Sequence, residues 1–533
     1  MPAAPPAARA APSAFAPLRD PVFRMLWGTW MTANICMWMT DVAAAWMMTS
    51  LTSSPMWVAL VQSAATLPVF LLGLPSGAFA DILDRRRYFM ATQFWIAVVA
   101  SVLCAVVMSG LLTPVLLLAM CFANGIGLAM RWPVYAAIVP DLVPRPQLPA
   151  ALALNGVAMN TSRIVGPLAA GAIIASAGTA YVFLLNAALS VVAGLVIMRW
   201  KHEQVPSPLG RERLSSAIRV GVQYVRQSDP MKAVLLRIAL FFFHSTALLA
   251  LLPLVARGMQ GGGAGTFTLL LASLGAGAIA TTLFLPRIRQ RMPGETMVLC
   301  GTLLQAAAMA VVALAPNACV AAPAMFVAGT GWIATANSLT VAAQLALPDW
   351  VRARGMSIYQ MSIMGAGALG AALWGQVATV GSVAASLLVA AASGAAAMMA
   401  AHARLAGRSQ HEDLTPGEFR LPEVAAPPGP GRVEMAIEYC IDPGRAAEFS
   451  ALMQESRRSR LRQGALAWEL VRDAGHSGRY VERIVDESWT EHLRRLSRIT
   501  TADVALRERK LAFHIGPVAP VVRRFIVESV LPS

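Results

Sequence analysis

Polar side chains recur at a regular spacing inside long apolar segments of this chain. They are Asn34 and Asp41, Asn124 and Arg131, His244, and Asn337 and Gln344. In three of these segments the two residues lie seven apart, so both project from one face of a helix. Such a face either lines an internal cavity or forms hydrogen bonds to a packed neighbouring helix, and the spacing alone allows both.

Asp41 is the only acidic residue well inside an apolar segment. A carboxylate inside a bilayer is costly while it is charged and unpaired. We therefore expect Asp41 to take up and release a proton, and a fixed structural ion pair is the alternative. Counted at 1.5 Å per residue from the segment ends, Asp41 lies about 27 Å deep, Arg163 about 20 Å and Arg131 about 10 Å. Arg163 is thus the expected partner of Asp41, which leaves Arg131 for an anionic group of a substrate or a loop carboxylate.

His244 is a second candidate for moving protons, because histidine titrates near physiological pH. The proton-coupling set predicted from the sequence is therefore Asp41, Arg163 and His244. A histidine that only packs and forms a hydrogen bond within the bundle is the alternative for His244.

The composition is that of an integral membrane protein. Of 533 residues, 57% are hydrophobic and 13% charged. The net charge of +15 fits basic loops that face anionic lipid better than it fits a nucleic-acid partner. No Cys-x-x-Cys pair, metal-ligand spacing or Walker-type phosphate loop occurs, so we expect no cofactor, no metal and no direct use of ATP.

Twelve segments have the roughly 20 apolar residues that a spanning helix needs. They are 23–48, 56–80, 88–110, 113–138, 150–175, 178–198, 233–256, 265–286, 296–315, 319–345, 355–378 and 381–402. The predicted fold is an all-α membrane bundle of twelve transmembrane helices in two six-helix repeats, residues 21–199 and 233–403. A cytoplasmic central loop, residues 200–232, joins them. Within it, residues 211–227 read either as a basic amphipathic helix on the membrane surface or as a solvated linker.

Basic residues gather in one set of loops, and the opposite set holds only Arg257. The basic loops hold Arg85 to Arg87, Arg145, the segment 199–232, Arg287, Arg289, Arg291, Arg352 and Arg354. Because positive loops face the cytoplasm, we expect a multi-pass protein of the plasma (inner) membrane with both termini cytoplasmic.

One basic loop carries a recognisable motif. Gly77, Asp81, Arg85 and Arg86 match the loop that follows the second helix of the major facilitator superfamily, and Ile82 and Asp84 depart from it. The chain resembles the branch of that superfamily that contains the enterobactin exporter and the transmembrane secretion effector proteins. The resemblance implies that this loop is a conformational latch. In it, Asp81 would face the N-terminus of the eleventh helix near Gly355, and Arg85 would pair with Asp141. Charge that merely sets the topology is the alternative.

The same resemblance implies that the first, fourth, seventh and tenth helices line a central cavity. The polar faces listed above fall on those four helices, and the expected substrate-cavity residues are Asn34, Asn124, Arg131, Asn337 and Gln344. The fifth helix carries Gly166, Pro167 and Gly171, which are similar to a motif of antiporter branches of the superfamily. This motif favours export, and a small-residue packing face without directional meaning is the alternative.

The termini differ in composition from the bundle. Residues 1–20 read as a disordered tail and 404–430 as a polar, Pro-rich linker. Residues 431–527 follow the order β-α-β-β-α-β, which predicts a cytoplasmic α+β domain of the ferredoxin-like kind. Ser488 to His492, Arg507 to Lys510 and His514 resemble antibiotic-biosynthesis-monooxygenase domains. We expect an auxiliary or dimerising role for this domain rather than catalysis.

The predicted function is secondary active export of a small molecule, siderophore-like or hydrophobic and drug-like, by alternating access and proton antiport. The expected partners are the substrate, protons and the lipid bilayer, with no nucleic acid and with dimerisation through the C-terminal domain. A proton-coupled importer on the same fold and a membrane-tethered oxygenase acting through 431–527 are the alternatives.

Overall fold

The structure is a computed structural model that describes residues 15–144, 147–200, 214–289, 291–405, 413–415, 417 and 431–527. The chain forms two compact units. One comprises the helices up to Gln204 with Arg237–Leu339 and Gln360–Arg404; the other comprises Val205–Leu236, Thr340–Tyr359 and the chain from Leu405 onward. Two predicted segments lie largely outside the described residues. They are the first 14 residues of the predicted tail 1–20 and most of the predicted linker 404–430.

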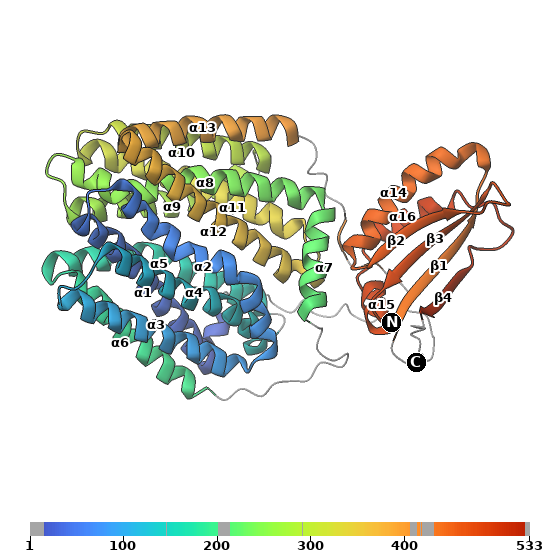
Figure 1. Cartoon of the computed structure of the whole chain (residues 1–533), viewed down its shortest axis with the longest axis horizontal. Coiled ribbons are helices and arrows are strands. Elements are labelled where there is room, and N and C mark those ends of the chain that lie inside the picture. Colours follow the sequence, from blue (N-terminus) through green and yellow to red (C-terminus); the bar gives the residue numbers. More distant parts are fainter. Residues whose placement is uncertain are drawn as a thin grey trace, which may run out of the picture. The chain divides into compact units, whose positions relative to one another are not determined.

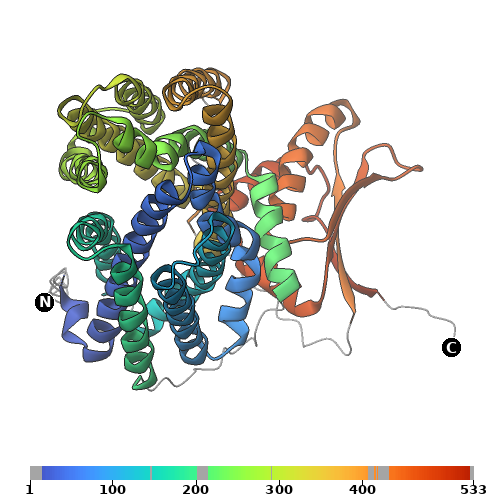
Figure 2. The same cartoon turned by 60° about the vertical axis from the view of Figure 1, so that its left-hand side comes forward.

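Each of the twelve predicted apolar segments corresponds to one helix (Figure 1). The first six are α1 (Pro21–Leu51), α2 (Pro55–Ile82), α3 (Arg85–Met108), α4 (Pro114–Leu142), α5 (Leu148–Ser176) and α6 (Thr179–Met198). The second six are α8 (Asp229–Gly258), α9 (Ala264–Arg289), α10 (Gly294–Leu314), α11 (Ala318–Leu345), α12 (Asp349–Val380) and α13 (Val383–Leu405). The turned view separates them into two groups, α1–α6 and α8–α13 (Figure 2).

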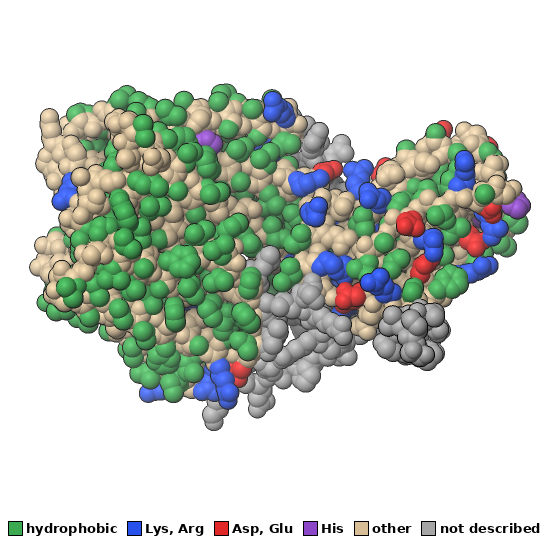
Figure 3. All heavy atoms as spheres, viewed as in Figure 1, with side chains coloured by type: hydrophobic (Ala, Val, Ile, Leu, Met, Phe, Trp, Pro, Cys, Tyr) green, Lys and Arg blue, Asp and Glu red, His purple; other side chains and the backbone are tan. Residues whose placement is uncertain are grey.

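Among the described residues, eleven helices are long and apolar enough to cross a membrane, and α1 is not one of them. Polar residues such as Asn34 and Asp41 lower the hydropathy of this 31-residue helix. It nevertheless packs against α5 and α6 inside the bundle. Figure 3 shows the outer face of the helices covered by hydrophobic side chains, as a lipid-facing surface requires.

The two groups of helices meet closely at the end of the bundle that carries Arg257, called here the Arg257 end. Arg257 at the end of α8 donates to the Thr49 carbonyl at the end of α1. Trp46 stacks on Phe267 of α9 with ring centroids 5.9 Å apart. The Met56 amide of α2 donates to Thr379 Oγ1 of α12 at 3.1 Å. These contacts close the two halves against each other at this end.

Small residues let α5 approach helices of both halves. A Cβ placed on Gly166 would lie 2.5 Å from Trp38 Cβ of α1, and one on Gly171 would collide with Thr268 of α9. Pro167 lies inside the helix, between them. The predicted small-residue motif is therefore a packing surface in the structure, and its association with antiport stays a prediction.

The C-terminal domain is a four-stranded antiparallel sheet in the order β2-β3-β1-β4. Its elements are β1 (Arg432–Cys440), α14 (Ala446–Arg462), β2 (Ala467–Arg472), β3 (Arg479–Asp486), α15 (Trp489–Ser497), α16 (Thr501–Leu511) and β4 (Val522–Val527). Alternate β1 residues such as Met435, Ile437 and Tyr439 form the core with Phe449 and Ile484. The predicted order of elements is thus present, with the second helical region divided into α15 and α16.

The segment between the two six-helix groups contains α7 (Leu214–Gln227), which packs on the C-terminal domain within the second compact unit. Val220 and Tyr224 on its inner face are 0% and 3% exposed. The prediction of an amphipathic helix in 211–227 is therefore confirmed for the described part, and the solvated-linker alternative is wrong. The apolar stripe of α7 is buried against protein, and its placement on the membrane surface stays a prediction.

Candidate functional site

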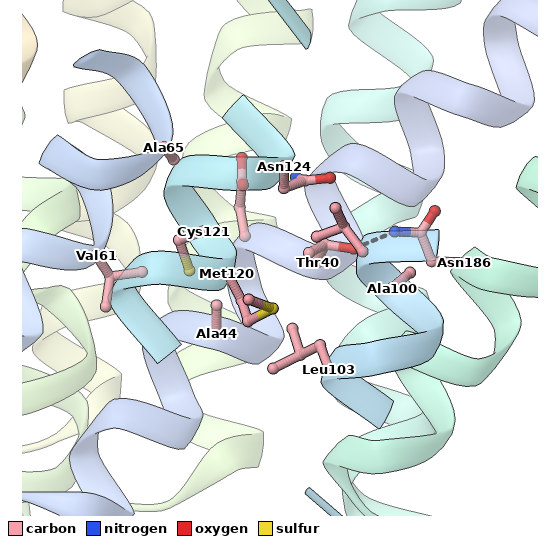
Figure 4. A pocket seen from close by; sticks show the side chains of 12 residues that line it. Thr40, Ala44, Val61, Ala65, Ala100, Leu103, Met120, Cys121, Asn124 and Asn186 are labelled. Atoms are coloured by element: carbon pink, nitrogen blue, oxygen red, sulfur yellow. Dashed lines mark hydrogen bonds between the residues drawn. The ribbon is translucent and has the colours of Figure 1, made fainter. Parts of the chain in front are cut away.

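Asp41 lines a small cavity in the first six-helix group. Figure 4 shows other residues that line this cavity. Asn124 and Cys121 of α4, Thr40 of α1 and Asn186 of α6 also line it. Its volume of about 10 Å³ is close to the roughly 10–15 Å³ that one water molecule needs. Thr40 Oγ1 accepts a hydrogen bond from Asn186 Nδ2 at 2.9 Å, while no described residue forms a hydrogen bond or ion pair with Asp41. The structure thus brings together two predicted site residues, Asp41 and Asn124, at a polar, water-sized space.

Arg131 is the cation whose positive charge acts on the carboxyl group of Asp41. Its side chain is 1% exposed, and its Nη1 donates to the Ala33 carbonyl of α1 at 3.2 Å. The guanidinium lies over the Trp30 ring, 5.5 Å from the centroid, and its charge acts on the Asp41 carboxyl. The expectation that Arg163 would be the partner of Asp41 is therefore wrong. Depth along a helix says nothing about the direction in which a side chain points around the helix axis.

Arg163 instead lies between two indole rings. Its guanidinium is 5.4 Å from the Trp38 ring of α1 and 4.5 Å from the Trp332 ring of α11. The close approach of α5 to α1 at Gly166 brings Arg163 to Trp38. Trp332 is a site residue that we did not predict from the sequence. A tryptophan in an apolar helix signals packing as readily as binding, so only the structure selects it.

Three tryptophans of α1 each lie under an arginine from another helix. Trp30, Trp38 and Trp46 are spaced by eight residues, which is about 12 Å per step along α1. The arginines are Arg131 of α4, Arg163 of α5 and Arg257 of α8, with Arg257 6.0 Å from the Trp46 centroid. A row of three cation–π pairs thus follows α1 through the bundle to the Arg257 end.

The remaining predicted cavity residues are dispersed. Asn34 is fully buried, and its Nδ2 donates to the Trp30 carbonyl at 2.7 Å. Asn337 is half-buried, whereas Gln344 is exposed in the last turn of α11. Their place on a shared cavity face stays a prediction.

His244 is separate from the Asp41 cavity. Its Nδ1 is 2.7 Å from the Leu240 carbonyl of its own helix. It lines an apolar groove of about 520 Å³ between α2, α8 and α12, with Phe70 and Leu369 among the lining residues. The ring also packs against Trp374. These surroundings match the packing alternative, and the structure does not bring His244 to Asp41 or Arg163.

The latch loop is described only in part. The side chains of Gly77, Asp81 and Asp141 lie outside the described residues, so the pairing of Arg85 with Asp141 stays a prediction. Asp84 caps α3 by accepting from the Arg86 and Arg87 amides at 2.9 and 3.2 Å. Arg86 donates through Nη2 to the Met198 carbonyl.

One element of the latch prediction is wrong. Gly355 does not lie at a helix N-terminus, because α12 begins at Asp349, six residues earlier. The structure also gives Asp84, a departure from the superfamily motif, a role of its own as a helix cap.

The described core of the C-terminal domain contains two buried polar clusters, around Glu482 and around Asp486. Burial would raise the pKa of Glu482, but Lys510 and Arg460 together with the Trp468 and Ser456 hydrogen bonds lower it to about 2. His492 is fully buried, with Nδ1 2.7 Å from Asp486 Oδ2. Burial likewise opposes ionisation of Asp486, yet Arg495 and His492 lower its pKa to about 2. A substrate could not reach His492 without unfolding this region.

Two groups of apolar helices with buried arginines between and within them define a multi-pass membrane transporter. A family model described as "Transmembrane secretion effector" matches residues 12–530. The chain therefore belongs to the transmembrane secretion effector family of the major facilitator transporters.

Curated relatives cover part of the chain. The staphyloferrin A transporter of Staphylococcus aureus is 23% identical over 254 residues, which is 47% of this chain and 63% of that protein. Macrolide efflux protein A of Streptococcus pyogenes is 26% identical over 242 residues, 44% of this chain and 58% of that protein. The chain thus spans about three fifths of the length of these relatives.

Solved structures share the fold at low identity. The nucleoside transporter NupG has a TM-score of 0.58 at 13% identity, covering 72% of this chain and 99% of that one. A bacterial homologue of the human lysosomal transporter Spinster, inward-facing and unoccupied, has a TM-score of 0.54 at 16% identity, covering 74% and 96%. These likenesses establish the transporter fold of the helical part.

Proposed function

We propose that this transporter exports a small molecule across the inner membrane by proton antiport. All twelve long helices, α1 included, would cross the membrane, with both termini cytoplasmic. The observation that carries the proposal is Asp41, a carboxyl without a fixed partner among the described residues, beside a water-sized polar cavity and under the charge of Arg131. A group so placed can exchange a proton with water in one state of a transport cycle and be neutralised in another.

Alternating access would follow from rocking α1–α6 against α8–α13. Contacts at the Arg257 end hold the halves together there, which fits a state open toward the opposite, arginine-rich side. The relatives' names, a staphyloferrin A transporter and a macrolide efflux protein, support export of siderophore-like or drug-like molecules. The latch residues Gly77, Asp81, Arg85, Arg86 and Asp141 would hold the arginine-rich side closed in the other state.

The C-terminal domain would be an auxiliary, ferredoxin-like cytoplasmic module coupled to the bundle through α7. Arg219 of α7 pairs with Glu487 at 2.9 Å, and Gln223 Nε2 donates to the Ala465 carbonyl at 2.8 Å. In the same unit, Arg498 lies over the Trp350 ring in the first turn of α12, 4.9 Å from the centroid. Motion of α7 and of the first turn of α12 would therefore also move the C-terminal domain. Dimerisation through this domain would link two copies of the transporter.

Transport by inside-out membrane vesicles tests the direction and the coupling. Vesicles with an acidic lumen would be loaded with the pH-sensitive dye ACMA and exposed to erythromycin or staphyloferrin A. Antiport predicts that substrate enters the lumen while protons leave, so the dye fluorescence recovers. Accumulation that requires protons to move with the substrate would instead establish the importer alternative.

A further inference from the structure

We infer that Arg163, Trp38 and Trp332 form a binding site for a carboxylate group of the transported molecule. This inference rests on the proposed transport function and adds to it the chemical class of the substrate. It comes from polar atoms at the centre of the bundle that are enclosed and lack partners.

Three hydrogen-bond donors of this site are buried without an acceptor: Arg163 Nε, Trp38 Nε1 and Trp332 Nε1. Buried donors in folded proteins are almost always paired, because an unpaired one loses its hydration and gains nothing in return. Arg163 contacts both indole rings, so the three unpaired donors gather around one guanidinium and indicate an acceptor that comes from outside the chain.

The charge of Arg163 is also uncompensated. Among the described residues Arg163 forms no hydrogen bond or ion pair. The two fully buried arginines of the described membrane helices each have a partner, which is the Ala33 carbonyl for Arg131 and Glu295 for Arg237. A buried cation without an anion is costly in lipid, so an anionic ligand fits this position better than a neutral one.

The geometry favours a carboxylate. The two indole rings lie against the guanidinium of the half-buried Arg163 side chain. Its Nε atom is enclosed, whereas its two terminal Nη atoms are not. The free edge of a guanidinium presents two parallel N–H groups that match the two oxygens of a carboxylate. A phosphate would bring close to two negative charges, and no second cation of the described residues contacts Arg163.

The site also joins the two halves of the transporter. Trp38 and Arg163 belong to α1 and α5, whereas Trp332 belongs to α11 of the second half. A carboxylate bound to a guanidinium that lies between rings of both halves would be released when the halves separate. Binding at this position is therefore sensitive to the conformational change that transport requires.

Calorimetric binding to the purified full-length protein in nanodiscs tests the inference without any gradient. The probes are citrate, its neutral trimethyl ester and inorganic phosphate. We expect citrate to bind the wild type, the ester to bind at least about tenfold more weakly, and Arg163→Gln to lose citrate affinity by at least about tenfold. Arg24→Gln is the control, because Arg24 is an exposed arginine of α1 that contacts neither indole ring, and it should bind citrate as the wild type does.

Arg163→Lys and Trp332→Phe keep the test decisive if Arg163→Gln does not fold. The first retains the charge without the planar fork and the second retains an aromatic ring without its N–H, so each should weaken citrate binding severalfold. Unchanged citrate affinity in folded Arg163 variants, absence of citrate binding to the wild type, or phosphate binding as tight as citrate would overturn the carboxylate assignment. Because no proton gradient is involved, failure of antiport would leave these results unaffected.

Discussion

The Arg163 guanidinium lies 4.5 Å from the Trp332 ring, across the boundary between the two six-helix halves. Arg163 reaches that position because α5 presses against α1 at Gly166, where a Cβ would lie 2.5 Å from Trp38 Cβ. The small-residue motif of α5 therefore has a local consequence: it sets the distance between an arginine and its two indole neighbours.

Gly166→Val should separate α5 from α1 and displace Arg163 from Trp38. Over-packing of this kind costs about 1–3 kcal/mol, so we expect a lower thermal unfolding temperature and loss of transport. Gly156→Ala, on the same helix with nothing within 4 Å of the added Cβ, is the matched control and should retain both. Wild-type transport by a stably folded Gly166→Val protein would show that this close approach is dispensable.

The sequence was sufficient to predict the helices and the order of strands because apolar length and alternation are strong, local signals. The polar positions on α1 and α4 were also predictable, but the cavity that Asp41 and Asn124 share lies within the first six-helix group and not between the first, fourth, seventh and tenth helices. Which arginine charge acts on Asp41 was not predictable, since Arg131 and Arg163 both reach α1 and only packing decides between them. The burial of α7 against protein could not be predicted from the sequence either, because an amphipathic helix has the same apolar pattern whether it packs on lipid or on protein.

The C-terminal domain should lose stability as the pH falls toward 2. The pKa of Glu482 is lowered to about 2 in the folded state, against an ordinary value near 4.5. The stabilisation is therefore complete above pH about 5 and disappears as the pH falls through the folded-state value, by on the order of 3 kcal/mol. Hydrogen exchange of β3 in the full-length protein between pH 6 and 3 should report this loss.

Glu482→Gln is the control for that experiment. Removing the charge leaves Lys510 buried without a carboxylate, so the domain should be less stable at pH 7 and its remaining dependence on acid should be shallower. An equal acid response in wild type and variant would mean that Glu482 is not the titrating group, and Asp486 would be the next candidate.

Val220→Asp should release α7 from the C-terminal domain. Val220 is fully buried and lies beside Gly464, so an added carboxylate would have no partner there. We expect faster hydrogen exchange over α7 and easier proteolysis between α7 and α8. Arg226→Ala, an exposed position on the same helix, is the control and should exchange as the wild type does. Unchanged protection of α7 in the Val220 variant would argue against this packing.

The central claim, that Asp41 couples proton movement to export, is tested most directly by proton flux from reconstituted vesicles. Wild type, Asp41→Asn and the control Asp20→Asn would be compared at matched protein content; asparagine still caps α1, so Asp20→Asn should behave as wild type. Substrate addition should release lumenal protons with wild type and not with Asp41→Asn, whose folding and substrate binding should persist. Substrate-driven proton release by Asp41→Asn at the wild-type rate would contradict it.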